Sequence, residues 1–350
     1  MAGLAKRAKR GVLHVGDAIG AVRQVRDSAW RRQRLAILCY HGVSLDDEHE
    51  WAPSYYISPA LLTERMQLLR DGGYAVLPLD DAVRRLYDGT LPHRAVALTF
   101  DDGAADFRLQ GLPILERFGY PATVYLTTHY CGHQRPVFGV VCSYLLWRAR
   151  GKVVDGGRVL DGEEQWDLRT ERGRAAALNA LRASAERRSL STAGKDALVE
   201  QLCAALGIDH AAVVARRTLQ IMTPDDVRDV VARGVSVELH THRHRTPRDA
   251  ALFRRELDDN RQRIVDLGAA DPVHFCYPSG VHHPSFLPWL RDAGVRSATT
   301  CESGLAAPAT DPLLLPRIID GGHLTPLEFR SCVSGFGEML PRRAAHAPED

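Results

Sequence analysis

The segment that most restricts the fold of this chain is Ala95–Phe100, a run of apolar and β-prone residues that ends in Asp101, Asp102 and Gly103. A run without a polar face is typical of a strand buried on both sides, as in a parallel sheet covered by helices. Two adjacent carboxylates at the end of such a strand can divide the work of one pocket, since one can bind a metal ion while the other moves a proton. Asp-Asp-Gly is also common in turns and helix caps, so this segment alone leaves both interpretations open.

A second strand-like segment, Val235–Leu239, runs into a corner with three histidines at alternate positions, His240, His242 and His244. Imidazole nitrogens and carboxylate oxygens are normal zinc ligands, and a catalytic zinc ion keeps three protein ligands and one open position for water. His240 and His244, with one aspartate of the first segment, would complete such a set. A histidine-rich surface loop is the alternative, but two polar corners at the ends of two strand-like runs favour a shared site.

These two corners resemble the first two motifs of the polysaccharide deacetylase family, the carbohydrate esterases with a NodB-homology domain. Thr99–Gly103 is similar to the family pattern T-F-D-D-G, and His240–His244 is similar to H-[ST]-x-x-H. The resemblance covers residues 35–336, and Cys39–Val43 also resembles a membrane-proximal bacterial branch of the family.

The resemblance implies that Asp101 is the catalytic base and that Asp102, His240 and His244 bind a divalent metal ion. Zinc is the expected ion, although oxygen and nitrogen ligands also suit cobalt and nickel. Such an ion acidifies its water and polarises a carbonyl group while a nearby carboxylate takes the proton. We therefore expect a hydrolase that removes N-acetyl groups from an N-acetylated sugar in a glycan or glycolipid. An O-acetyl esterase, a non-sugar amidohydrolase and a non-catalytic glycan-binding module are the alternatives.

The third family motif, usually R-x-P-[YF]-G, is altered in this chain. Cys276 replaces the arginine and Ser279 replaces the aromatic residue, although Phe275–Gly280 matches the Phe-x-Tyr-Pro-x-Gly version of a related branch. We expect Arg317, at the end of the last predicted strand, to supply the missing cation to the base.

The remaining candidate site residues follow other predicted strands. His323, in Gly-Gly-His-Leu, is a poor match to the apolar-x-His pattern that normally supplies the general acid, and His282 and His283 compete with it. Three further residues, His41, Tyr277 and Ser279, are expected to contact substrate. A lone histidine such as His41 is, however, often purely structural.

Strand-like and helix-like segments alternate over residues 35–336, which predicts an α/β fold with a parallel sheet. The length suits an irregular (β/α) barrel of about seven strands with extensions. Residues 131–220 interrupt the alternation and predict an inserted helical cap that shapes the substrate groove. We expect residues 337–350 to be a flexible tail.

The composition limits the partners and the compartment. A net charge of +2 argues against a dedicated nucleic-acid-binding protein. The seven cysteines include no C-x-x-C pair, and we expect them to be reduced, which favours a cytoplasmic location. No apolar run reaches transmembrane length, and the N-terminus lacks the continuous apolar core of a signal peptide.

Residues 1–34 form a basic N-terminal extension with nine Lys or Arg and only Asp17 and Asp27 as acids. Its apolar residues recur at close to helical spacing. A basic amphipathic helix can lie on an anionic membrane surface, here the inner face of the membrane. A solvated helix or a frayed tail explains the same pattern.

Overall fold

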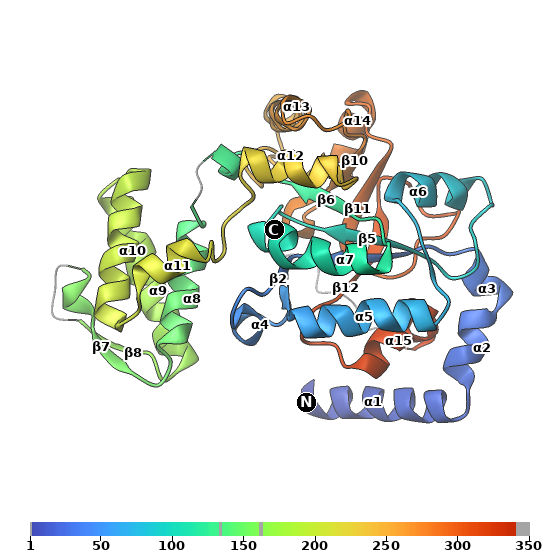
Figure 1. The fold of residues 1–350 in the computed structure, drawn as a ribbon, viewed down its shortest axis with the longest axis horizontal. Coiled ribbons are helices and arrows are strands. Elements are labelled where there is room, and N and C mark those ends of the chain that lie inside the picture. The colour runs from blue at the N-terminus through green and yellow to red at the C-terminus, as the bar shows by residue number, and fades with distance from the viewer. Residues whose placement is uncertain (1, 133–134, 161–163, 341–350) are drawn as a thin grey trace.

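A computed structural model describes residues 2–132, 135–160 and 164–340, and within this part of the chain seven parallel strands close into a barrel (Figure 1). The strands follow one another around the barrel in the order β1, β12, β11, β10, β9, β6 and β5, and β5 pairs again with β1. The predicted (β/α) barrel is therefore confirmed. The strands are β1 (Ala36–Tyr40), β5 (Ala95–Phe100), β6 (Thr123–Leu126), β9 (Ser236–Leu239), β10 (His274–Cys276), β11 (Ser297–Ser303) and β12 (Leu315–Ile319).

The seams between the strands differ in length. β1 and β5 share five registered residue pairs, whereas β9 and β10 share one, Leu239 with Phe275. An eighth strand, β4 (Ala75–Val76), pairs with the first residues of β5, while β6 pairs with its last residues. The extra strand therefore extends the wall without widening the barrel.

Alternate residues of the strands face two separate cores. Side chains from five strands form one cluster together with residues of the segment 79–86, whereas a larger cluster joins the other face of the strands to the surrounding helices. The period of two follows from strand geometry, since successive side chains point to opposite faces. The smaller cluster includes Ile37, Ala97, Tyr125, Cys276 and Leu315.

Helices cover the outside of the barrel. Ser58 caps the first of them by accepting a hydrogen bond from the backbone N–H of Leu61, and Thr223 and Asp226 cap another reciprocally. Both helices begin where a serine or threonine followed by proline predicts a helix start. The helices are α5 (Pro59–Asp71), α6 (Leu79–Tyr87), α7 (Leu112–Phe118), α12 (Pro224–Ala232), α13 (Ala250–Asp266), α14 (Phe286–Asp292) and α15 (Pro326–Ser334).

Short elements that the sequence did not predict surround the carboxyl ends of the strands. After β1, a parallel pair of strands encloses a one-turn helix, and after β5 a π-helix precedes α7. These elements are β2 (Gly42–Val43), α4 (Glu48–Trp51), β3 (Tyr56–Ile57), the π-helix η1 (Phe107–Gly111) and the 3-10 turn η4 (Pro278–Gly280).

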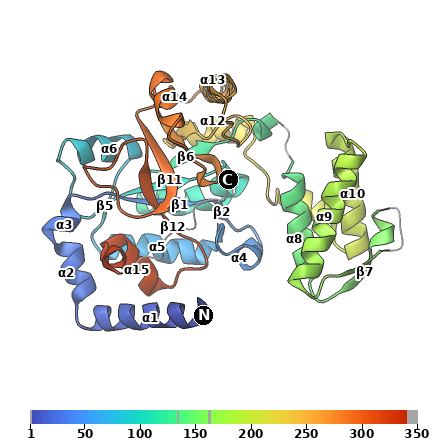
Figure 2. The ribbon, with the colours of Figure 1, turned by 180° about the vertical axis from the view of Figure 1, so that it is seen from behind.

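The inserted segment forms a lobe beside the barrel with a hydrophobic core of its own (Figures 1 and 2). The lobe contacts α4, where the Tyr144 hydroxyl donates to Asp47 and the rings of Trp51 and Tyr144 lie 5.4 Å apart. It is not purely helical, because it includes an antiparallel hairpin. Its elements are α8 (Phe138–Arg148), β7 (Val153–Asp155), β8 (Gln165–Asp167), α9 (Glu171–Arg187), α10 (Thr192–Leu206) and α11 (His210–Ala215).

The N-terminal extension is folded against the body rather than frayed. It comprises α1 (Ala2–Ala18), α2 (Ala21–Asp27) and α3 (Ala29–Arg32), and α1 lies along the outer edge of the molecule beside α15. None of the described helices is both long and apolar enough to span a membrane.

The C-terminal segment stays ordered further than expected. The predicted tail begins at 337, but Phe336–Met339 forms a 3-10 turn in which Glu338 accepts a hydrogen bond from the Leu305 N–H. Residues 341–350 lie outside the described residues, so the prediction of a flexible tail stays untested there.

Candidate metal and active site

The ends of β5 and β9 bring Asp102, His240 and His244 together. Asp102 Oδ1 lies 3.2 Å from Nε2 of each histidine, and the three ligand atoms lie within 4.8 Å of one another. Burial opposes the charged form of Asp102, but hydrogen bonds to the two imidazoles outweigh it and hold the pKa of Asp102 well below its usual value. The predicted ligand set is thus assembled, with one oxygen and two nitrogens.

The orientation of His240 fits a bound cation. Its Nδ1 lies 2.9 Å from the carbonyl oxygen of Cys276, and because a carbonyl only accepts, Nδ1 carries the proton. Burial opposes the charged form of His240, but the groups around it, among them Asp102 and Asp101, raise its pKa well above its usual value, so Nε2–H donates to Asp102; a bound cation would take the place of that proton between the ring nitrogen and the carboxylate. A carbonyl that orients the ring of a ligand histidine is also a common support of metal sites.

Helix α13 supports the loop that contains both histidines. Asn260 is fully buried; its side-chain oxygen accepts from the His240 N–H at 2.9 Å, and its amide donates to Thr128 Oγ1 at 2.9 Å. One turn earlier, the buried Glu256 accepts from the backbone N–H of Arg243 at 2.8 Å. Within the loop, His244 has a φ of 55°, a left-handed conformation that is uncommon for residues other than glycine. These contacts hold that conformation in place.

The second carboxylate of the pair, Asp101, forms a bidentate ion pair with Arg317 of β12. The two N···O distances are both 2.7 Å, and both side chains are buried. Burial alone would raise the pKa of Asp101, but the guanidinium outweighs it and keeps the pKa well below its usual value. The structure therefore places Arg317 where the sequence predicted the missing cation, and the carboxylate it contacts is ionised.

Cys276 explains why the arginine comes from another strand. Its Sγ lies 3.4 Å from Asp101 Oδ2 and 3.1 Å from a terminal nitrogen of Arg317. The short thiol leaves space inside the barrel, and the Arg317 side chain fills that space from β12.

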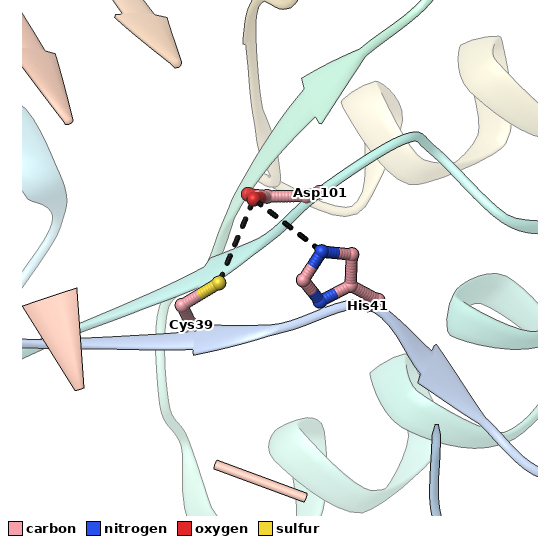
Figure 3. Close-up of side chains that lie close together, drawn as sticks. All are labelled: Cys39, His41 and Asp101. Carbon is pink, nitrogen blue, oxygen red and sulfur yellow. Dashed lines mark hydrogen bonds and ion pairs between the residues drawn. The ribbon is translucent and has the colours of Figure 1, made fainter. Parts of the chain in front are cut away.

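Two residues of β1 and its end border the same carboxylate, as Figure 3 shows. Cys39 Sγ donates to Asp101 Oδ2 at 3.5 Å, and His41 Nε2 lies 3.9 Å from the same oxygen. The His41 side chain is 19% exposed and contacts the edge of the Tyr55 ring, with 5.2 Å between the ring centroids. His41 thus lies between the buried ion pair and solvent, a position from which it can reach a substrate.

Three predicted site residues lie elsewhere. Tyr277 is buried and its hydroxyl donates to the Leu313 carbonyl at 2.9 Å, so its side chain lies in the core, and the expected contact with substrate stays a prediction. Within the described part of the chain, the contact recorded for His323 is with the Pro53 carbonyl at 3.4 Å, and none joins it to Asp101.

Ser279 is exposed in the η4 turn with a φ of 55°. The two histidines that compete with His323 contact their own turn: His282 Nδ1 lies 3.1 Å from the Gly280 carbonyl, and His283 Nδ1 lies 2.8 Å from Ser285 Oγ.

Sequence reasoning missed the supporting residues, among them Cys39 and Asn260. Cys39 lies two residues before His41 on the same strand, and strand alternation could have placed both on the inner face. Nothing in the sequence marks Asn260, because its partners His240 and Thr128 follow two other elements, β9 and β6.

The comparisons with known proteins agree with this geometry. A sequence model of one family, described as polysaccharide deacetylase, matches residues 88–158 and 196–298. The two ranges include both carboxylates and both histidines, and the gap between them falls in the inserted lobe. Arg317 lies beyond the matched ranges.

Two curated relatives match a shorter stretch. The Bacillus subtilis protein YxkH, described as belonging to the polysaccharide deacetylases, is 30% identical over 112 residues, which are 31% of this chain and 38% of that protein. A poly-β-1,6-N-acetyl-D-glucosamine N-deacetylase of Escherichia coli K12 is 32% identical over 100 residues, which are 27% of this chain and 14% of that protein. The match thus spans well under half of the length of either relative.

Two solved structures share the fold. A Streptococcus pyogenes deacetylase, PplD, in complex with acetate superposes with a TM-score of 0.55 at 17% identity, covering 86% of this chain and 98% of the other. IcaB from Ammonifex degensii superposes with a TM-score of 0.53 at 16% identity, covering 86% and 97%. At these identities the likeness concerns the fold alone.

Proposed function

Because the chain belongs to the polysaccharide deacetylase family, we propose that it is a metal-dependent hydrolase that removes N-acetyl groups from an N-acetylated sugar in a glycan or glycolipid. The observation that carries the proposal is the pair of carboxylates at the end of β5. One lies between two imidazoles, and the other is held ionised by a buried guanidinium.

Asp102, His240 and His244 would hold the metal ion, which would supply Lewis acidity to a water molecule and to the carbonyl group of the acetamide. Asp101 is placed to accept a proton from a water molecule that attacks the carbonyl carbon. Arg317 fixes the orientation of this carboxylate and lowers its pKa, so the base is weak but ionised at neutral pH.

The amine must then be protonated to leave. His41 is favoured over His323 for contact with the substrate, because His41 lies beside Asp101 and is partly open to solvent, whereas His323 contacts Pro53. A His41→Gln variant separates two roles of this residue. Loss of a proton donor would lower kcat, whereas loss of a sugar contact would raise KM.

The test is acetate release from poly-β-1,6-N-acetylglucosamine and chitin oligomers by protein loaded with zinc, cobalt or nickel. Removal of the metal with a chelator should abolish turnover, and readdition should restore it. Asp101→Asn should lower kcat at least 100-fold while metal binding is retained, and the exposed Asp225→Asn should behave as wild type.

Other outcomes would redirect or refute the proposal. Acetate release only from O-acetylated sugars would make the chain an esterase. Stoichiometric metal and tight glycan binding without acetate from any acylated sugar would make it a binding module.

A further inference from the structure

Helix α1 exposes a stripe of apolar side chains to solvent. Val12, Val15 and Ile19 are 49%, 61% and 74% exposed, and their spacing puts them on one side of the helix and of the turn that follows it. Leu13, on the opposite side, is 1% exposed. Large aliphatic residues that gather on one face of a helix and remain exposed indicate a surface that meets another apolar phase.

The orientation of this stripe is fixed by the packing of α1 on the body. Arg10 forms an ion pair with Glu328 at 3.1 Å, and Asp17 forms one with Arg330 at 2.8 Å, both on α15. Gly16 meets the ring of Phe336 so closely that a Cβ would lie 2.6 Å from the ring. The helix is therefore fastened on its inner side, and Figures 1 and 2 show it along an outer edge of the molecule.

The charge of this region differs from that of the rest of the chain. Residues 1–34 contain nine Lys or Arg and two acids, whereas the other 316 residues contain 36 Lys or Arg and 41 acids. Both acids are paired with arginines outside the extension, Asp17 with Arg330 and Asp27 with Arg94 at 2.7 Å. The extension is thus an electropositive segment on a mildly acidic body.

We propose that α1 lies in the plane of an anionic lipid surface, with Val12, Val15 and Ile19 inserted at the boundary between headgroups and acyl chains. An apolar stripe combined with a basic segment is the feature by which interfacial helices bind such surfaces. A second copy of the chain fits less well, because a stable protein interface buries roughly 20 residues on each side and the stripe offers three.

Three aliphatic side chains give weak insertion, so binding depends on electrostatic attraction as well. We expect association with vesicles that contain phosphatidylglycerol, much weaker association with pure phosphatidylcholine, and a loss of at least tenfold in affinity when NaCl is raised from 0.1 to 0.5 M. This surface is independent of the proposed catalysis.

The experiment is cosedimentation of the full chain with vesicles of these two compositions. In Val15→Ser/Ile19→Ser, which keeps the net charge, affinity for anionic vesicles should fall at least tenfold. The matched control is Val214→Ser/Val265→Ser, which changes two aliphatic residues that are 50% and 42% exposed on α11 and α13 and should bind as wild type.

Several outcomes would overturn the proposal: no association with anionic vesicles, equal binding to neutral ones, or binding that the α1 variant leaves intact. Self-association that this variant abolishes, without vesicle binding, would assign the stripe to a second copy. Acetate release from a soluble oligomer without vesicles should be equal in all variants, so its absence would count against the catalytic proposal alone.

Discussion

The thiol of Cys276 occupies the place where the family motif has a guanidinium, and Arg317 reaches the same carboxylate from β12. The apolar runs before them predicted that these aspartates and histidines follow strands, and the resemblance to the family motifs assigned their roles to Asp101, Asp102, His240 and His244. The residues that support them could not be predicted in the same way, since a buried contact depends on which strands become neighbours.

Arg317→Met should leave Asp101 buried without its cation. Breaking a buried pair costs about 3 to 5 kcal/mol, and kcat should fall at least 100-fold. In the native fold the pKa of Asp101 is depressed, so the pair stabilises the protein above the unfolded pKa of about 3.9, and this contribution is lost as the pH falls below it. Urea unfolding at pH 7 and pH 3 should show a large difference between variant and wild type at pH 7 and a smaller one at pH 3.

The acidic limb of the pH–rate profile of the same variant should move to higher pH, because the pKa of an unpaired buried carboxyl rises. Adding Cys276→Arg should restore part of the activity by returning a cation to the third motif. The surface variant Arg254→Met is the control, and a profile that does not move would mean that Arg317 has no influence on the base.

Asn260→Ala should weaken metal binding by about 10- to 100-fold, because the backbone of His240 and the Thr128 hydroxyl both lose a partner. Titration calorimetry with zinc or cobalt measures this without reference to turnover. Gln262→Ala, on the exposed side of the same helix, should leave the affinity unchanged. Equal affinities in all three proteins would show that α13 does not position the ligands.

At the scale of elements, the sequence predicts helices that begin with a capping serine or threonine followed by proline. Ser58 with Pro59, and Thr223 with Pro224, begin α5 and α12 where expected. The same signal, Thr325-Pro326 with Glu328, begins α15, so the sequence is sufficient to predict this helix start as well. The β7–β8 hairpin and the β2–β3 pair escaped prediction because two- and three-residue strands carry no periodicity.

Glu328 has two tasks at the element scale, since it caps α15 through Thr325 and binds Arg10 of α1. Burial opposes its charge, but the hydrogen bonds from Arg10 and Thr325 lower its pKa to about 2. The attachment of α1 is therefore strongest above the ordinary glutamate pKa of about 4.3 and is lost as the pH falls toward 2. Hydrogen exchange of α1 amides, corrected for intrinsic rates, should accelerate over that range.

Glu328→Gln should show faster α1 exchange already at pH 7 and less dependence on acid. Glu302→Gln, at an exposed site, provides the comparison. If α1 exchanged equally in all three proteins, the ion pair with Arg10 would not hold the helix.

At the scale of the whole molecule, the sequence predicted the alternation of strands and helices and the interruption at 131–220, and the barrel followed. The barrel is closed by pairing of β1 with both β5 and β12, and the second pairing joins Leu38 to Ile318, which no local pattern can predict. The lobe likewise has a hydrophobic cluster of its own, with Leu202 and Cys203 among its buried residues, and Trp51 of α4 packs against it, so its fold depends on contacts between segments far apart in the chain.

Among the described barrel strands, β9 and β10 share the fewest registered residue pairs. The hydrogen bond from His240 Nδ1 to the Cys276 carbonyl joins the ends of these two strands. A cation that orders the ring would therefore also fasten the two strands to each other. Amide exchange near Leu239 and Phe275 should slow on zinc binding, while exchange along the five-pair seam of β1 and β5 should not change. Loss of the metal would then increase local opening of the β9–β10 pair, beside α13. Metal binding would therefore make this part of the barrel more rigid.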